Sequence, residues 1–564
     1  MTMHHSISPM PKHPIQTTLT ALRPRCWKTL VMLAPLFLVA CGTNTPLPPW
    51  PSTSTTPRPT TPAPFPPRAQ KGIVVPAPLG QQQAPVVLAS PLPVPPPLIV
   101  RDEGAMAPPY SAAVAARFPD PSVVYSTPGL APDRRALTTN AELNQWLQSI
   151  ADTPSKTATR SQLLNIGASQ RGAPITGLLL TRASSTEPAA LDASGRPTVV
   201  LIGQQHGDEP AGSEALLVIA RELAQGLLEP LLNRINVVII PRANPDGAEV
   251  SERTTDNGTD LNRDHLLLTT PEARALAQIV DTYRPSLVID AQEFEAVGRI
   301  TQKFSAFQRY DVLLQYTTTA NYPEFLTKAS QEWYYEPMVA ALKGQGLASN
   351  WYFTTSDDLN DKQLAMGGTQ PDTSRNVNGL KNAVSLLVAT RGTGLGRTHL
   401  QRRVHSQVTA ITSALRSTAD RGGNLGQVRS FVARDISALA CRDSMVVEAA
   451  ATPTQRDVVF IDPETGADRT VRVDWQSSTA LRTVKARQRP CGYWIAAESI
   501  AVVERLRQLG LQVVRVAESG AMLAETYRET GRELIALSVA VNAQSPKLST
   551  EPPSTVQVKV STVR

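Results

Sequence analysis

The residues best suited to chemistry are His206 and Glu209, three positions apart in the tetrapeptide His-Gly-Asp-Glu. They follow an apolar run at residues 198–203 and precede an amphipathic stretch that begins at Pro210. Imidazole nitrogen and carboxylate oxygen are both good zinc donors. At the mouth of a strand-to-helix turn, both side chains can reach one metal ion. This spacing therefore predicts the beginning of a zinc site.

An alternation of strands and helices must position these residues. Four short, nearly continuous apolar runs predict strands that are buried on both faces. These runs are residues 199–203, 237–240, 287–290 and 384–388. Helical patterns follow Pro210 and Pro271, where proline suits a first helical turn. The alternation predicts an α/β fold with α/β/α layers and a mixed sheet, whose ligand sites lie at the carboxyl ends of strands.

Five blocks, in order, resemble the zinc metallocarboxypeptidase family of the carboxypeptidase A type. They are His206-Gly-Asp-Glu209, Asn244-Pro-Asp-Gly247, Asp260-Leu-Asn-Arg-Asp264 (preceded by Arg253 and Gly258), Ile289-Asp-Ala-Gln-Glu293 and Leu387-Val-Ala-Thr-Arg-Gly392. The resemblance extends over about residues 138–415. It implies a layered α/β peptidase fold, a zinc cofactor and peptide C-termini as ligands.

The resemblance also implies roles for individual residues. His206 and Glu209 match two zinc ligands. Arg253 matches the catalytic arginine that stabilises the oxyanion formed from the scissile carbonyl. Asn262 and Arg263 match the pair that binds the terminal carboxylate of the substrate, for which a planar guanidinium offers two hydrogen bonds.

Three positions depart from the family pattern. Gln292 stands where the third zinc ligand is a histidine, and a neutral amide oxygen is a much poorer zinc donor. Ala389 stands where the general base is a glutamate, and loss of a general base lowers rates by about 10²–10⁴-fold. Val377 aligns with the active-site tyrosine. Asp290 is the expected hydrogen-bond partner of the metal site.

We interpret this combination as a carboxypeptidase-like protein that binds peptide C-termini, for example those of cell-wall peptides. Its catalysis is expected to be lost or much weakened, and its hold on zinc poor. The alternative is an active metallocarboxypeptidase with relocated groups, Glu293 or Glu295 as base and His265 or His399 as third ligand. Glu293 is adjacent to Gln292, so in a strand it points to the opposite face. A third interpretation, a structural platform without a small ligand, fits the retained carboxylate-binding pair less well.

The first 40 residues predict a bacterial lipoprotein signal peptide. Three basic residues precede an apolar stretch of about a dozen residues, too short to span a bilayer. The stretch ends at Leu38-Val-Ala-Cys41, which resembles a lipobox, so we expect a lipid anchor on Cys41. Gly42 favours the outer membrane, with the protein facing the periplasm. Residues 41–125 are rich in Pro, Thr and Ser and predict a disordered tether.

The remaining chain divides into a main domain at residues 126–420 and an accessory domain at 425–545. The accessory domain is expected to be a small α/β module with a hairpin around residues 462–466, a helix at 498–510 and a strand at 511–516. Cys441 and Cys491 are candidates for a disulfide in an oxidising compartment, and two buried thiols are the alternative. The formal charge of +7 includes four basic leader residues. Without a basic stripe, no nucleic-acid partner is expected.

Overall fold

An eight-stranded mixed sheet forms the centre of the fold in the computed structural model, which describes residues 109–517, 524–536 and 554–563. The strand order is β1-β2-β4-β3-β5-β11-β7-β8. The strands are β1 Arg160–Ala168, β2 Pro174–Thr181, β4 Asn236–Ile240, β3 Thr198–Gly203, β5 Leu287–Glu295, β11 Val384–Thr393, β7 Val312–Tyr316 and β8 Ser349–Trp351. The central strands β4, β3, β5 and β11 are parallel to one another. The pairs β1–β2, β2–β4 and β7–β11 are antiparallel, and β8 is parallel to β7. The four strands expected from sequence are the parallel centre, and the predicted mixed sheet is confirmed.

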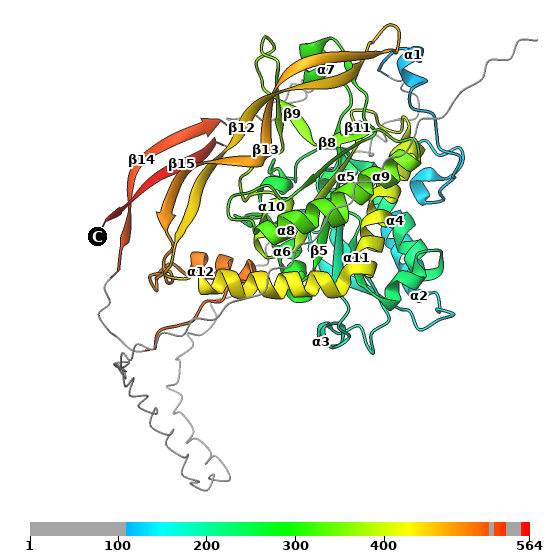
Figure 1. The fold of residues 1–564 in the computed structure, drawn as a ribbon. Coiled ribbons are helices and arrows are strands. Elements are labelled where there is room, and N and C mark those ends of the chain that lie inside the picture. Colours follow the sequence, from blue (N-terminus) through cyan, green and yellow to red (C-terminus); the bar gives the residue numbers. More distant parts are fainter. Residues whose placement is uncertain (1–108, 518–523, 537–553, 564) are drawn as a thin grey trace, which may run out of the picture. The chain divides into compact units, whose positions relative to one another are not determined.

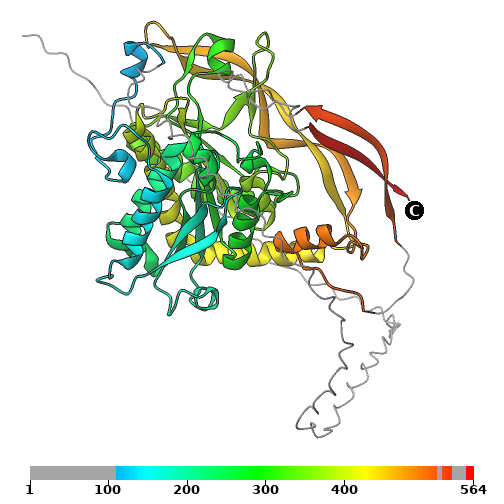
Figure 2. The ribbon, with the colours of Figure 1, turned by 180° about the vertical axis from the view of Figure 1, so that it is seen from behind.

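Helices cover both faces of this sheet (Figure 1 and Figure 2). One face carries α2 Asn140–Asp152, α4 Pro210–Gln225, α8 Glu324–Ala329, α9 Glu336–Gly344 and α11 Leu400–Ala438. The other face carries α3 Pro188–Ala193, α6 Pro271–Tyr283 and α10 Ser374–Leu380. In β3, Val199 and Leu201 join the first core, and Val200 and Ile202 join the second. This alternation explains why the central strands are apolar throughout.

Short helices complete the connections. They are α1 Ala112–Ala115, α5 Pro245–Val250, α7 Arg299–Phe304 and α12 Ile500–Gln508, the 3-10 turns η2 Pro128–Leu130, η3 Glu229–Asn233 and η4 Leu261–Arg263, and the π-helical η5 Ser330–Tyr335. Among the residues described here, no helix is both long enough and apolar enough to cross a membrane.

A second, five-stranded sheet has the order β6-β12-β13-β10-β9. Its strands are β6 Phe307–Gln308, β12 Ser444–Ile461, β13 Asp468–Gln488, β10 Gln363–Met366 and β9 Phe353–Thr355. The expected hairpin is present, because β12 and β13 pair antiparallel across a turn in which Asp462 Oδ1 accepts a hydrogen bond from the Thr465 amide at 2.9 Å. Separately, β14 Thr526–Ala536 pairs with β15 Ser554–Val563.

Three expectations about the ends of the domains differ from the structure. The predicted strand at residues 511–516 is wrong: no strand forms there, because Leu511, Val514 and Val516 are exposed and no neighbouring strand pairs with them. Helix α11 runs without interruption through the boundary expected near residue 425. The tether was expected to reach residue 125, whereas Val114 and Phe118 are already buried, in one apolar cluster with Ile461.

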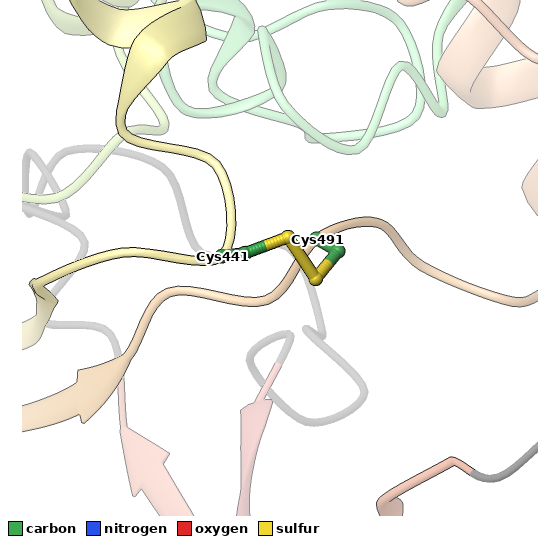
Figure 3. Close-up of a disulfide and its surroundings, with 2 residues drawn as sticks. All are labelled: Cys441 and Cys491. Atoms are coloured by element: carbon green, nitrogen blue, oxygen red, sulfur yellow. A yellow bond between two sulfur atoms is a disulfide. The ribbon is translucent and has the colours of Figure 1, made fainter. Parts of the chain in front are cut away.

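Two expectations concern cysteines. Cys441, after α11, and Cys491, after β13, are joined by a disulfide with an S–S distance of 2.07 Å (Figure 3). The bond closes the base of the β12–β13 hairpin, since Ser444 and Gln488 are the first paired residues inside it. The expected anchor, Cys41, lies outside the residues that the structure describes.

Candidate functional site

A tight turn between β3 and α4 presents His206 and Glu209 at the carboxyl edge of the sheet. Gln204 leaves the strand with a φ of 46°, and Glu209 occupies the N-cap of α4, with Pro210 in its first turn. A side-chain carbon at Gly207 would lie 2.0 Å from the carbonyl carbon of Gly247, so only glycine fits there. The turn thus brings the loop after β3 against the loop after β4.

His206 is buried between two carboxylates. Its Nδ1 lies 2.8 Å from Glu209 Oε1, and its Nε2 lies 3.0 Å from Asp260 Oδ1. Burial and Arg253 lower the pKa of His206, but Glu209 and Asp260 outweigh them and raise that pKa to about 9. Both ring nitrogens are therefore engaged by carboxylate oxygens.

Arg253 holds the same two carboxylates from the other side. Its Nη2 donates to Asp260 Oδ2 at 3.0 Å, and its Nη1 lies 3.4 Å from Glu209 Oε1. The four side chains of His206, Glu209, Arg253 and Asp260 form a closed ring of alternating charge. Opposite charges at these distances favour the ionised forms. Accordingly, His206 and Arg253 hold the pKa of Asp260 well below its usual value, although burial alone would raise it.

The end of β5 places Asp290 and Gln292 on one face of the sheet. Gln292 Nε2 donates to Asp290 Oδ2 at 2.5 Å, and Gln205 Nε2 donates to Asp290 Oδ1 at 2.7 Å. Burial raises the pKa of Asp290 to about 7, against the lowering effect of the Gln205 hydrogen bond. Asp290, the expected hydrogen-bond partner of the metal site, is thus bonded to the side-chain amides of Gln205 and Gln292.

Ala389 lies beside Gln292 on the neighbouring strand β11 and is fully buried. The two residues are paired in register, so their side chains point to the same face of the sheet. The position expected to hold the general base therefore does face the site, and it carries a methyl group that cannot take a proton. Val377, aligned with the active-site tyrosine, lies in the apolar core between α6 and the sheet.

The relocated groups of the alternative interpretation do not meet at this site. Glu293 lies on the opposite face, where both its oxygens bind the buried Arg403 at 2.8 and 2.7 Å. Glu295 is exposed and accepts a hydrogen bond from the Arg299 amide at 3.3 Å. Neither carboxylate has a hydrogen bond or ion pair to His206 or Glu209 in the structure.

The two candidate histidine ligands are also held elsewhere. His265 Nε2 lies 2.6 Å from Gln205 Oε1, and burial lowers the pKa of His265 to about 4, so the neutral ring donates this bond. His399 stacks against Tyr110, with the ring planes 5° apart and centroids 6.1 Å apart. Both belong to packed regions beside the site and not to the ring of charges around His206.

The expected carboxylate-binding pair sits in η4. The side-chain oxygen of Asn262 accepts from the Ser374 amide at 2.9 Å, which fixes this buried residue against α10. Arg263 is exposed, and its Nη1 donates to the Asn262 carbonyl at 2.9 Å. Arg263 is therefore exposed to solvent next to Asn262, whose side chain is fixed by its hydrogen bond to Ser374.

Three residues that sequence reasoning left without a role complete this region. Arg375 is buried in the first turn of α10, donates to the Gly368 carbonyl at 3.0 Å, and has no hydrogen-bond partner for Nε among the described residues. Burial raises the pKa of Tyr352, Glu209 raises it further, and the positive charges of Arg253, Arg263 and Arg375 oppose that rise. Asp260, the third, stands two residues before Asn262 in the block Asp260-Leu-Asn-Arg-Asp264. That proximity was the available signal.

The residues present do not fit the zinc ion that the resemblance implies. His206 and Glu209 offer two suitable donors, but the third position supplies only the Gln292 amide, and Ala389 supplies none. Within residues 109–517, 524–536 and 554–563, no group of three or more His, Cys, Asp or Glu side chains is arranged to hold a metal ion. The site is therefore a basic, carboxylate-lined cluster without a complete set of zinc ligands.

Comparison with known proteins finds carboxypeptidases that are similar to this chain in sequence. Residues 143–398 match the zinc carboxypeptidase family. Probable carboxypeptidase 2 of Trichophyton verrucosum is 27% identical over 325 residues, which cover 57% of this chain and 62% of that protein. Carboxypeptidase D of Mus musculus is 37% identical over 133 residues, 18% of this chain and 10% of that protein. The chain thus spans less than two thirds of the length of these relatives.

Solved structures with lower sequence identity are also similar to part of this chain. A metallo-carboxypeptidase from Pseudomonas aeruginosa is 16% identical, with a TM-score of 0.37, and the match covers 52% of this chain and 73% of that one. A metallo-carboxypeptidase from Burkholderia cenocepacia is 15% identical, with a TM-score of 0.35, over 49% of this chain and 69% of that one. By this sequence match, residues 143–398 are similar to the zinc carboxypeptidase family.

Proposed function

We propose that this protein binds the C-terminal carboxylates of peptides and has lost, or greatly weakened, the ability to cleave them. The observation that carries the proposal is a contrast between two parts of one site: the positions for catalysis are substituted, and the positions for carboxylate binding are retained. The general-base position is the buried Ala389, and the third ligand position is Gln292, bonded to Asp290. The basic groups that suit a carboxylate remain, with Arg263 exposed beside Asn262.

The charges of the site support an anionic ligand. Arg253 already faces two carboxylates, whereas Arg375 is buried with no carboxylate in hydrogen-bond contact in the described structure. The positive charges of Arg263 and Arg375 both lower the pKa of Tyr352, so the two arginines belong to one positive region. A carboxylate bound by guanidinium groups gains charge-assisted hydrogen bonds, each stronger than a neutral one. In this proposal Arg263 orients the chain end, Asn262 holds Arg263 in place, and Arg375 supplies further positive charge.

We further propose that the protein works in a bacterial envelope, anchored through Cys41 to the outer membrane and facing the periplasm. The lipobox-like end of the leader and the Pro-rich stretch after it support this location. Peptides with free C-termini in that compartment, including cell-wall peptides, are the ligand class.

The test compares one fluorescent peptide in two forms, with a free C-terminal carboxylate and with a C-terminal amide. The proposal predicts that the purified protein binds the free acid at least about tenfold more tightly, because only that form can accept charge-assisted hydrogen bonds. Mass spectrometry of the same samples should show intact peptide. Equal affinity for the two forms would exclude carboxylate capture.

The second candidate is an active metallocarboxypeptidase, favoured by the preserved proximity of His206 and Glu209. Zinc-dependent appearance of the peptide shortened by one residue would support that candidate and contradict the loss of catalysis. Because binding and cleavage are read from the same samples, the two outcomes are separable.

A further inference from the structure

A second cluster of charged side chains lies where the end of β11 meets the first turns of α11 and residues 110–118. Arg391, Arg402 and Arg403 converge there around a small cavity. Glu293 and Asp311 are the two carboxylates within this cluster. The function proposed above uses none of these residues.

Two of the three arginines are fully engaged. Arg402 donates to Asp311 through Nε at 2.7 Å and Nη2 at 3.1 Å, and its Nη1 donates to the Pro119 carbonyl at 2.8 Å. Arg403 donates to both oxygens of Glu293 and also to backbone carbonyls. Each carboxylate is thus matched by one guanidinium in a two-bond pair.

Arg391 is the guanidinium that remains. It is only 3% exposed, and its Nη1 donates to the Gln308 carbonyl at 2.8 Å. Among the described residues, its Nε and Nη2 have no partner within hydrogen-bond geometry, and the Tyr110 hydroxyl, which is also buried without such a partner, is the neutral group that acts on Arg391. The guanidinium carbon lies 4.3 Å from the centre of the Phe118 ring, so aromatic groups shield it from water. His399, across the same cavity, likewise has an Nε2 without a partner there.

This arrangement leaves one buried positive charge unmatched, since three guanidinium groups face two carboxylates. A buried charge without a counter-charge is strongly unfavourable, and neutral hydrogen-bond partners satisfy its donors without cancelling the charge. The cavity measures about 10 Å³, which is about the size that one water-sized sphere requires. A polyatomic anion such as sulfate is too large for that space.

We propose that this cavity binds one small monovalent anion of the halide class, chloride under ordinary conditions, against the free Nε and Nη2 of Arg391. The neutral ring of His399 can donate its Nε2 hydrogen to the same ion. The ion would neutralise Arg391 and link three segments: β11, the start of α11 and residues 110–118.

The direct test is a crystal of the full protein grown in sodium bromide, with anomalous scattering measured at the bromine edge. The proposal predicts an anomalous peak within contact distance of Arg391 Nη2. The absence of an anomalous peak at Arg391 would overturn the proposal, whether or not bromide peaks are present at exposed lysines.

The solution test measures thermal unfolding in sodium chloride and in sodium gluconate at equal ionic strength. An ion that binds only the folded state lowers the unfolding equilibrium constant about tenfold for each tenfold rise in chloride above its Kd. Gluconate, which cannot enter the cavity, should have no such effect. Equal stabilisation by both salts would contradict the proposed site. A bromide peak in the crystal would then be an adventitious ion only.

Arg391→Met should abolish the chloride-specific stabilisation. Arg429→Met is the matched control: Arg429 is another largely buried arginine, but its donors reach the Asn382 carbonyl at 2.8 Å and Ser286 Oγ at 2.6 Å. This control should lose stability yet keep the full chloride response. If Arg391→Met does not fold, the bromide crystal of the unaltered protein decides alone.

Discussion

Ala389 and Gln292 are paired in register across the parallel strands β11 and β5, and their side chains share one face of the sheet. The resemblance expects a base and a third metal ligand at these two positions, which are therefore adjacent points of one site. A single local change would not restore them, because each position supplies a different group. Because the two positions are paired, a base and a third ligand introduced there would point to the same face of the sheet.

The double variant Gln292→His/Ala389→Glu should gain zinc binding and release C-terminal residues from peptides. The histidine would complete a three-ligand set with His206 and Glu209, and the glutamate would supply the base, worth about 10²–10⁴-fold in rate. The control is Gln292→His/Ala389→Gln, which places the same bulk in the packed position without a base. Product formation followed by mass spectrometry should separate the two variants, and equal rates would refute the assignment of position 389.

Arg263→Ala should remove most of the preference for free C-termini over amides. The lost charge-assisted hydrogen bonds are worth about 1.5–3 kcal/mol, so affinity for the free acid should fall about tenfold to 150-fold. Arg171→Ala serves as the control, since Arg171 is also exposed and reaches only Asp256 at 3.9 Å. Fluorescence anisotropy measures both variants. An unchanged free-acid preference in Arg263→Ala would show that another group captures the carboxylate.

Glu293→Gln should destabilise the fold by about 3–5 kcal/mol, because it leaves Arg403 buried without its partner. The two side chains are 0% and 3% exposed and form a 2.7 Å ion pair. Asp457→Asn breaks an exposed pair with Arg472, 59% exposed on both sides, and should change stability by less than about 1 kcal/mol. Chemical denaturation compares them. If Glu293 acted as a catalytic base, its loss would instead alter turnover while stability stayed the same.

Asp361→Asn should destabilise the protein at neutral pH and much less in acid. Asp361 pairs at 2.6 Å with Lys303, whose side chain is only 1% exposed, and the hydrogen bond from Lys303 lowers the pKa of Asp361 to about 2. A lowered carboxyl pKa stabilises the fold above the ordinary value of 3.8 and loses that effect as pH falls toward 2. The expected loss is about 1–3 kcal/mol at pH 7.

Denaturation curves of the unaltered protein and Asp361→Asn, taken between pH 7 and pH 2, should therefore converge. Asp358→Asn, on the same loop and bonded mainly to the Asn360 amide, is the control. If the difference in stability between the two proteins stays constant across this range, the interaction of Lys303 with residue 361 does not depend on the charge of Asp361.

The sequence was sufficient for the centre of the fold and for the chemistry of individual positions. Apolar runs on both faces identified β3, β4, β5 and β11, because burial on two sides leaves no other pattern. The change at Ala389 was visible by type alone. The hairpin of β12 and β13 followed from its turn residues, whereas residues 511–516 have strand-like composition but no pairing partner.

Partnerships across distant segments were beyond sequence reasoning. Asp260 reaches His206 over 54 positions, and its place in the block before Asn262 indicates the site but not this partner. Tyr352 and Arg375 come from a loop and a helix that only the folded sheet brings near Arg263. Glu293 was correctly expected to point away from Gln292, but its partner Arg403 lies 110 positions further on, and only the packing of α11 reveals it.

The most direct test of the central claim is a turnover assay of the unaltered protein in excess zinc, with a panel of free-acid peptides analysed by mass spectrometry. The account predicts that peptides are bound but remain intact. Release of C-terminal residues that zinc sustains, chelation stops and His206→Ala abolishes would contradict it.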